Sequence, residues 1–145
     1  MSVPKGKLDE HQKVEAVIND LRTQVTIRYD PEKLIMQFSE ADNFKKTYTG
    51  KDIYVCLAKV RADFPHITFL CKGAKINVMP SRMASQMGAG LVAYEMTMGR
   101  PATRVDIVHI FDYEEENLTT DPQVQINFFK NWLISLGAED YEKFN

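Results

Sequence analysis

Apolar residues in the middle of the chain recur at helical spacing between Pro80 and Pro101. At about 100° per residue, five of them fall on one side of a helix. These five are Met83, Met87, Leu91, Tyr94 and Met98. Ser81 offers an N-cap, and Gly99 before the second proline offers a stop. The spacing predicts a central helix, largely covered by the rest of the protein.

Two glycines, Gly88 and Gly90, lie inside this predicted helix. Each costs about 1 kcal/mol relative to alanine in a helix interior. We therefore expect another backbone, from this chain or from a partner, to approach closely there. Five of the seven methionines lie between Met79 and Met98. A stripe at helical spacing favours a core position, although methionine also serves adaptable binding surfaces.

The N-terminal third predicts a helix followed by two strands. Residues 8–25 carry an amphipathic stripe, residues 25–29 alternate like a strand, and residues 34–38 read as a returning strand. A proline-containing turn over residues 30–33 joins the two strands. Residues 39–51 are polar and are expected to be irregular. The stripe consists of Val14, Val17, Ile18, Leu21 and Val25.

Further along, the pattern predicts a helix over residues 53–64 with Asp52 as its cap and a proline after its end. Residues 67–71 and 74–78 flank Lys72-Gly73, which is typical of a hairpin.

Two segments complete the chain. Residues 103–111 are ambiguous: their β-branched content favours a strand, whereas Thr103 and Asp106 form a capping-box pattern, and we prefer a short helix. Asp121 and Gly137 bracket a final amphipathic helix that begins with proline.

Together these elements predict one α+β domain over residues 1–145, with four or five helices and a small, mostly antiparallel sheet. The 145 residues are 44% hydrophobic and 26% charged, as in ordinary globular proteins. No apolar run of about 18 residues or secretory signal is present, so we expect a cytoplasmic protein that does not enter a membrane. Cys56 and Cys71 lie in apolar segments and are expected to be buried, reduced thiols.

The net charge of −2 conceals a segregation of charge along the chain. Residues 51–105 hold eight basic and three acidic side chains, whereas residues 106–145 hold two basic and nine acidic ones. Such asymmetry indicates a charged partner. Alternatively, the two segments face each other within one fold and neutralise.

If the protein is an enzyme, the sequence offers one candidate catalytic cluster, formed by Asp106, His109 and Asp112. On a helix these residues would lie on adjacent turns, where a carboxylate can orient an imidazole as a general base. A histidine hydrogen-bonded locally at the edge of the core is the favoured alternative. No metal-ligand spacing, phosphate loop or dinucleotide fingerprint is present, so we expect neither metal nor cofactor.

A nucleic-acid reading is weaker, because the sequence pI is about 5.9 and no known module signature occurs. Its candidate contacts are the basic residues of the central segment with one aromatic: Lys72, Lys75, Arg82, Arg100, Arg104 and Tyr94.

The stronger signal is the acidic tract around residues 106–121. Its carboxylates surround one aromatic residue, and such a surface can steer a basic partner. The alternative is a solvated acidic loop. The predicted partner-binding residues are Asp106, Asp112, Tyr113, Glu114, Glu115 and Glu116.

Three blocks of sequence carry a resemblance to a known group of proteins. They are S-R-M-x-x-Q-M-G-x-G-L-x-A-Y followed by G-R-P, then I-F-D-Y, then F-F-x-x-W-L-x-S-L, within residues 76–136. The pattern resembles small bacterial immunity proteins of contact-dependent-inhibition and polymorphic-toxin systems. This resemblance implies a cytoplasmic, non-catalytic inhibitor that binds a cognate toxin domain, often a nuclease, and blocks its active site. Members of this group diverge too far for contact residues to be transferred by motif, so the acidic positions rest on charge alone.

Overall fold

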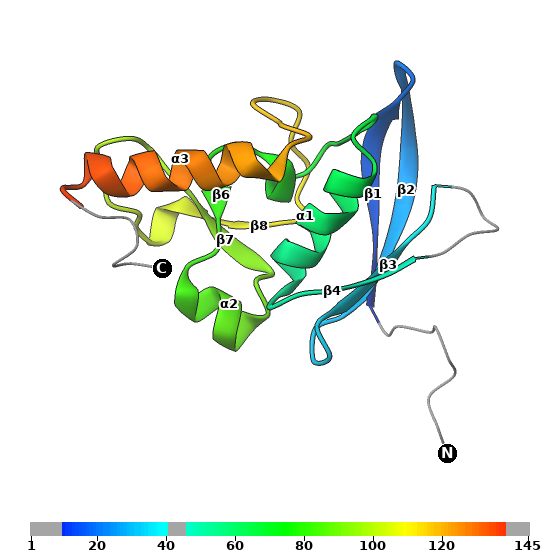
Figure 1. The fold of residues 1–145 in the computed structure, drawn as a ribbon, viewed down its shortest axis with the longest axis horizontal. Coiled ribbons are helices and arrows are strands. Elements are labelled where there is room, and N and C mark those ends of the chain that lie inside the picture. Colours follow the sequence, from blue (N-terminus) through cyan, green and yellow to red (C-terminus); the bar gives the residue numbers. More distant parts are fainter. Residues whose placement is uncertain (1–9, 41–45, 139–145) are drawn as a thin grey trace.

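The computed structural model describes residues 10–40 and 46–138, which form two antiparallel sheets and three α-helices (Figure 1). The first sheet is curled, with strand order β4-β3-β2-β1-β5, and the second has the order β6-β7-β8. The first sheet comprises β1 (Glu10–Ile18), β2 (Leu21–Asp30), β3 (Ile35–Phe38), β4 (Lys46–Thr49) and β5 (Ile67–Phe69). The second comprises β6 (Val78–Met79), β7 (Val92–Glu95) and β8 (Ile107–His109). The helices are α1 (Ile53–Asp63), α2 (Arg82–Gly88) and α3 (Pro122–Ser135).

The α+β class is therefore confirmed, but the described residues contain three α-helices rather than four or five. The described part of the predicted helix over residues 8–25 forms strands, and residues 103–111 form a 3₁₀ turn followed by a strand, which accounts for the difference. The strands also form two sheets, of five and three strands, rather than one small sheet. No helix in the described residues is long and apolar enough to cross a membrane.

The predicted helix over residues 8–25 is wrong: its described part, from residue 10 onward, forms the β1–β2 hairpin. The side chains alternate, so that Val14 and Ala16 are buried while Lys13 is exposed. Asn19 and Asp20 make the connection with φ angles of +53° and +65°, a backbone conformation typical of two-residue hairpin turns. The apolar spacing fitted a helix as well as a strand, and pairing between the two strands decided for the strand.

Several predictions that depend on local signals are confirmed. The strand over residues 25–29 lies within β2, and the proline turn leads into β3. Asp52 caps α1 by accepting a hydrogen bond of 2.7 Å from the backbone N–H of Val55. In the same way, Asp121 caps α3, which begins at a proline.

The main core lies between α1 and the inner face of the curled sheet. Phe38 of β3 is buried in this core, with T-shaped ring contacts to Phe64 and Phe69 at centroid distances of 5.0 and 5.5 Å. Both cysteines are buried free thiols, as predicted, and burial raises the pKa of each to about 11. Burial at both positions disfavours the thiolate form that a reactive cysteine needs.

The predicted central helix is much shorter than expected. α2 spans seven residues, and the left-handed residues Ala89 and Gly90 end it before β7 begins. The prediction that its methionines lie in the core is also wrong for the two methionines within α2, because Met83 and Met87 are 70% and 83% exposed. Pairing of β7 with both β6 and β8 replaces the second half of the predicted helix.

The two glycines of this stretch behave differently. Gly90 has φ +70°, and a Cβ added there would lie 2.7 Å from Cγ of Asp52. Gly88 has no atom within 4 Å of such a Cβ. The expected approach of another backbone is therefore wrong at Gly88, and at Gly90 the close neighbour is instead the side chain of Asp52 in the same chain.

Three further expectations are corrected. The predicted hairpin over residues 67–78 does not form, because β5 pairs with β1 and β6 pairs with β7. β4 lies in the stretch of residues 39–51 that was expected to be irregular. Residues 103–111 combine both alternatives: a capped 3₁₀ turn at Arg104–Asp106 leads into β8.

Candidate partner-binding surface

The acidic segment is held rigidly against the body of the protein by its backbone. Five backbone hydrogen bonds of 2.7–3.2 Å join residues 110–119 to residues 70–76. They run from Lys72 to Asp112, Gly73 to Ile110, Glu114 to Leu70, Ile76 to Asn117 and Thr119 to Ala74 (donor first). The segment therefore presents its side chains from a fixed frame rather than from a loose loop.

Glu114, at the centre of the acidic segment, forms ion pairs with two lysines. Its carboxylate accepts hydrogen bonds from Nζ of Lys72 at 2.9 Å and of Lys75 at 2.6 Å, and its side chain is only 11% exposed. Both lysines also pair with Glu95, at 2.9 and 3.1 Å. Burial alone raises the pKa of Glu114, but the hydrogen bonds from Lys75 and Lys72 outweigh it and lower that pKa to about 2.

Through Glu114 this four-residue ion network joins the basic and acidic segments, and Arg100 with Asp106 makes a second such pair, so the two segments neutralise each other only in part. Glu114 therefore helps to hold the acidic segment in place and is not part of its exposed surface. The sequence shows the lysines and glutamates from which the network is made, but only the fold shows which lysines pair with Glu114.

Tyr113 and Glu115 form a second cluster with Arg22 at the tip of the β1–β2 hairpin. The Tyr113 hydroxyl donates a hydrogen bond of 2.6 Å to Glu115, and Arg22 donates to that hydroxyl at 3.0 Å and to Glu115 at 3.3 Å. The hydrogen bond to Glu115 raises the pKa of Tyr113 and lowers that of Glu115. With 48% of its surface exposed, Tyr113 still leaves part of its ring open to solvent. Sequence reasoning missed Arg22 because it lies about 90 residues away and carries no motif.

The remaining predicted site residues separate into two groups. Asp112 and Glu116 are exposed, and within the described residues neither takes part in an ion pair. Asp106 instead accepts hydrogen bonds from the backbone N–H of Thr103 at 2.8 Å and from Arg100 at 3.4 Å. We call the exposed residues Asp112, Tyr113, Glu115 and Glu116 the acidic face.

The fold does not assemble the Asp106–His109–Asp112 cluster of the catalytic reading. Nδ1 of His109 accepts a hydrogen bond of 3.2 Å from the backbone N–H of Phe111, two residues on. The backbone N–H of Asp112 donates to the carbonyl of His109 at 3.0 Å, but in the described part of the chain no hydrogen bond joins the imidazole of His109 to the carboxylate of either aspartate. The geometry matches the alternative of a locally bonded histidine.

Two clefts are lined by other residues. The larger, of about 710 Å³, lies between the N-terminal half of α1, the helix α2 and the first turns of α3, with Tyr54 and Phe129 among its apolar walls. The smaller, of about 410 Å³, lies along β2 and β3. His109, Asp106 and Asp112 line neither cleft. Among residues 10–40 and 46–138, no three histidine, cysteine or acidic side chains are placed to hold a metal ion.

Ion pairs also involve three of the basic residues that the sequence offered as candidate contacts to nucleic acid. Lys72 and Lys75 are committed to Glu95 and Glu114, and Arg100 pairs with Asp106. These pairs reduce the positive potential that a phosphate backbone would meet.

Comparison of the sequence with models of known protein families gives no match, and comparison with curated proteins gives none either.

Replacing His109 with alanine is expected to leave the biological activity of the protein unchanged. The substitution removes one local hydrogen bond and a tilted ring contact to Phe111 at 5.9 Å. The measurement is the cellular phenotype of the variant together with the melting temperature of the purified protein. A purified protein that turns over a nucleotide, ester or peptide and loses this activity in a folded His109→Ala variant would establish the catalytic reading instead.

Proposed function

We propose that this protein is a non-catalytic immunity factor that acts in the cytoplasm and neutralises a toxin domain by binding it tightly and covering its active site. The observation that carries the proposal is the acidic face, an exposed aromatic ring among carboxylates on a backbone that is already ordered. The resemblance of residues 76–136 to immunity proteins supports the same conclusion.

The charge of the acidic face suits a partner with a basic site. Asp112, Glu115 and Glu116 are exposed carboxylates within three residues of Tyr113, and Glu115, which also pairs with Arg22, accepts a hydrogen bond from the tyrosine hydroxyl. Exposed charges of one sign accelerate association with a partner of opposite sign. A nuclease active site, which must bind phosphates, carries the basic groups that such a face would meet.

Preorganisation raises the affinity that the acidic face can reach. Ordering loops and side chains on binding is a main cost of association. The backbone hydrogen bonds to residues 70–76 and the ion pairs of Glu114 order the segment when the protein folds, so this order need not be gained on binding. Tyr113 then supplies the aromatic contact area typical of binding hot spots.

The test uses the toxin domain encoded by the adjacent gene and measures binding kinetics at two salt concentrations. Replacing Glu115 and Glu116 together with glutamine should slow association about 3- to 10-fold at low salt and leave dissociation nearly unchanged, because rim charges act mainly on encounter. The difference should shrink at high salt, since the screening length falls to about 3 Å at 1 M. Tyr113→Ala should instead speed dissociation by about tenfold or more.

A matched control changes two exposed glutamates outside the acidic face. Glu10→Gln with Glu32→Gln removes the same charge from the start of β1 and from the β2–β3 turn. Equal effects of the two double variants would mean that only net charge matters. Unchanged association in the Glu115/Glu116 variant would show that these carboxylates are only solvated, and the exposed methionines of α2 would be the next surface to test. A toxin domain that the protein neither binds nor neutralises would overturn the proposal.

A further inference from the structure

The larger of the two clefts, of about 710 Å³, is walled by apolar side chains that stay partly exposed. Val55 and Ala58 of α1, Met79 of β6 and Phe129 of α3 are half-buried, and Ile126 of α3 is 39% exposed. Small-molecule sites commonly have volumes of about 300–1,000 Å³ and mostly apolar walls. The cleft is therefore large enough to hold a ligand with an apolar body.

The three helices around the cleft are fixed by polar contacts, so its walls are held apart. Near the start of α3, the buried Gln125 donates a hydrogen bond of 2.9 Å to the carbonyl of Gly73. Near the end of that helix, Trp132 donates to a backbone carbonyl after β7 at 3.0 Å. The N–H of Ile53 donates to the carbonyl of Ala89 at 2.8 Å and joins the start of α1 to the end of α2. A cleft with fixed walls spares a ligand the cost of ordering them.

The accessible charge of this cleft is positive. Of the described residues that line it, Asp52 alone carries a carboxylate, and Asp52 is 1% exposed and accepts the capping hydrogen bond from Val55. Lys51 and Arg82 supply the positive charges of the lining. Lys51 is exposed, and among residues 10–40 and 46–138 it belongs to no ion pair. Its ammonium and the hydroxyl of Ser85, which also lines the cleft, can donate to an anion.

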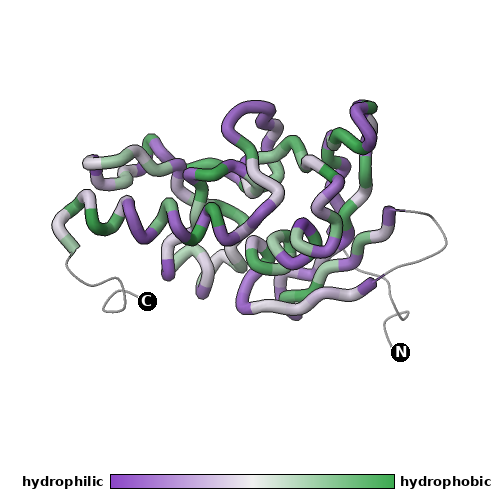
Figure 2. The backbone as a smooth tube through the Cα atoms, turned by 45° about the horizontal axis from the view of Figure 1, so that its top comes forward, coloured by the Kyte–Doolittle hydropathy of each residue, from purple (hydrophilic) through white to green (hydrophobic). Residues whose placement is uncertain are grey.

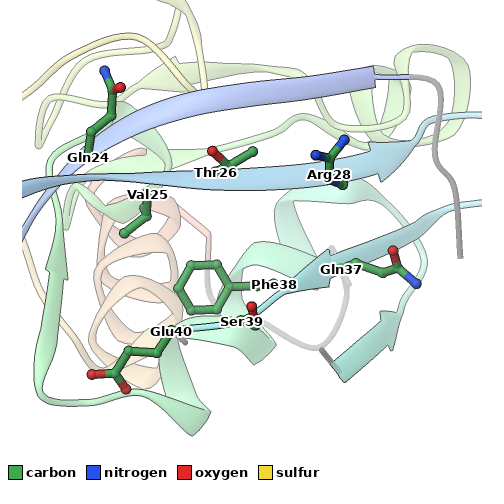
Figure 3. Close-up of a pocket in the computed structure, with 8 residues that line it drawn as sticks. All are labelled: Gln24, Val25, Thr26, Arg28, Gln37, Phe38, Ser39 and Glu40. Carbon is green, nitrogen blue, oxygen red and sulfur yellow. The ribbon is translucent and has the colours of Figure 1, made fainter. Parts of the chain in front are cut away.

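The smaller cleft, along β2 and β3, has a different lining (Figure 3). Of the eight described residues that line it, Val25 and Phe38 are apolar and the others are polar or charged. Arg28 and Glu40 bring charges of both signs. This cleft offers little apolar wall and no single sign of charge, so it serves as an internal comparison for the larger one.

We propose that the larger cleft binds a small molecule with an apolar body and one carboxylate. The apolar body lies against Val55, Ala58 and Phe129, where its burial removes apolar surface from water. The carboxylate pairs with Lys51, because a hydrogen bond between two charged groups is stronger than one between neutral groups. No residue of the acidic face is among the described residues that line this cleft, so the site is separate from the proposed toxin contact.

The test uses decanoate as the probe and decyltrimethylammonium as a cation with the same alkyl chain. The purified full chain, labelled with nitrogen-15, is titrated with each probe and followed by amide NMR. We expect saturable binding of decanoate with a dissociation constant on the order of 100 µM, within the affinity range of ligands of this size. The largest shifts should fall on the amides of Ala58, Ser85 and Phe129. The cation should bind about fivefold more weakly or worse, since it meets a like charge.

Three variants separate the apolar and the charged parts of the site. Lys51→Glu should weaken decanoate about tenfold and remove its preference over the cation, because a like charge replaces the pairing ammonium. Ala58→Phe should weaken both probes about tenfold or more, since the added ring occupies the cleft. Arg28→Glu makes an equal charge reversal in the smaller cleft and should leave decanoate binding unchanged. Melting temperatures show whether each variant is folded, and Lys51→Glu, at an exposed position, decides the matter if the Ala58 variant does not fold.

Four results would each overturn the proposal. They are an absence of saturable binding up to about 2 mM decanoate, largest shifts at the smaller cleft, equal affinity for the two probes, and unchanged decanoate binding in Lys51→Glu. All of them are independent of toxin binding, because the protein is measured alone.

Discussion

Replacing Gly90 with alanine should lower the free energy of unfolding by about 3 kcal/mol. Two costs add in this variant. The backbone at Gly90 has φ +70°, which costs a residue with a Cβ about 1–3 kcal/mol. The new Cβ would also lie 2.7 Å from Cγ of Asp52, the buried cap of α1, and crowding of this kind costs about 1–3 kcal/mol.

Gly88→Ala is the matched control two residues away. Gly88 ends α2, and no atom lies within 4 Å of an added Cβ. This variant should be neutral or stabilise the protein by up to about 1 kcal/mol. Denaturant unfolding of both variants is the measurement. Equal stability of the two would show that contact with Asp52 does not restrict this turn.

Glu114→Ala should cost about 3 kcal/mol at neutral pH, a second large effect and one that exposed glutamates should not show. The carboxylate accepts hydrogen bonds from Lys72 and Lys75 and from the backbone N–H groups of Glu115 and Glu116. Hydrogen bonds to charged groups contribute about 1.5–3 kcal/mol each, and removal leaves the lysines sharing Glu95. Glu116→Gln, at an exposed position, should change stability by less than about 0.5 kcal/mol.

The same residue predicts a pH dependence. The ordinary pKa of a glutamate is 4.5 and that of Glu114 in the folded protein is about 2. Its ionised form therefore stabilises the fold fully above about pH 4.5, and this contribution is lost as the pH falls toward 2. Wild-type stability should fall more steeply than that of Glu114→Gln over this interval. Parallel curves would show that Glu114 titrates alike in the folded and unfolded chain.

Local chemistry in the sequence predicted the elements whose ends depend on neighbouring residues. α1 and α3 begin where Asp52 and Asp121 cap them, because a cap satisfies backbone N–H groups two or three positions away. In the same way, the proline in residues 30–33 predicted the turn that joins β2 to β3. The acidic tract was also visible, since consecutive carboxylates need no fold to be recognised.

Long-range pairing decided the rest. The apolar spacing of residues 8–25 and of residues 91–98 suits a helix and a strand alike, and strand pairing decided between them. β1 pairs with β2 across a two-residue turn and with the more distant β5, and β7 pairs with β6 and β8. Figure 2 shows hydrophilic and hydrophobic residues alternating along much of the chain. The acidic segment illustrates the same division between what the sequence and the fold decide. The sequence placed Tyr113 and Glu114 side by side in one acidic run. Only the tertiary structure separated them, because folding brought Lys72 and Lys75 to Glu114 and left Tyr113 exposed beside Arg22.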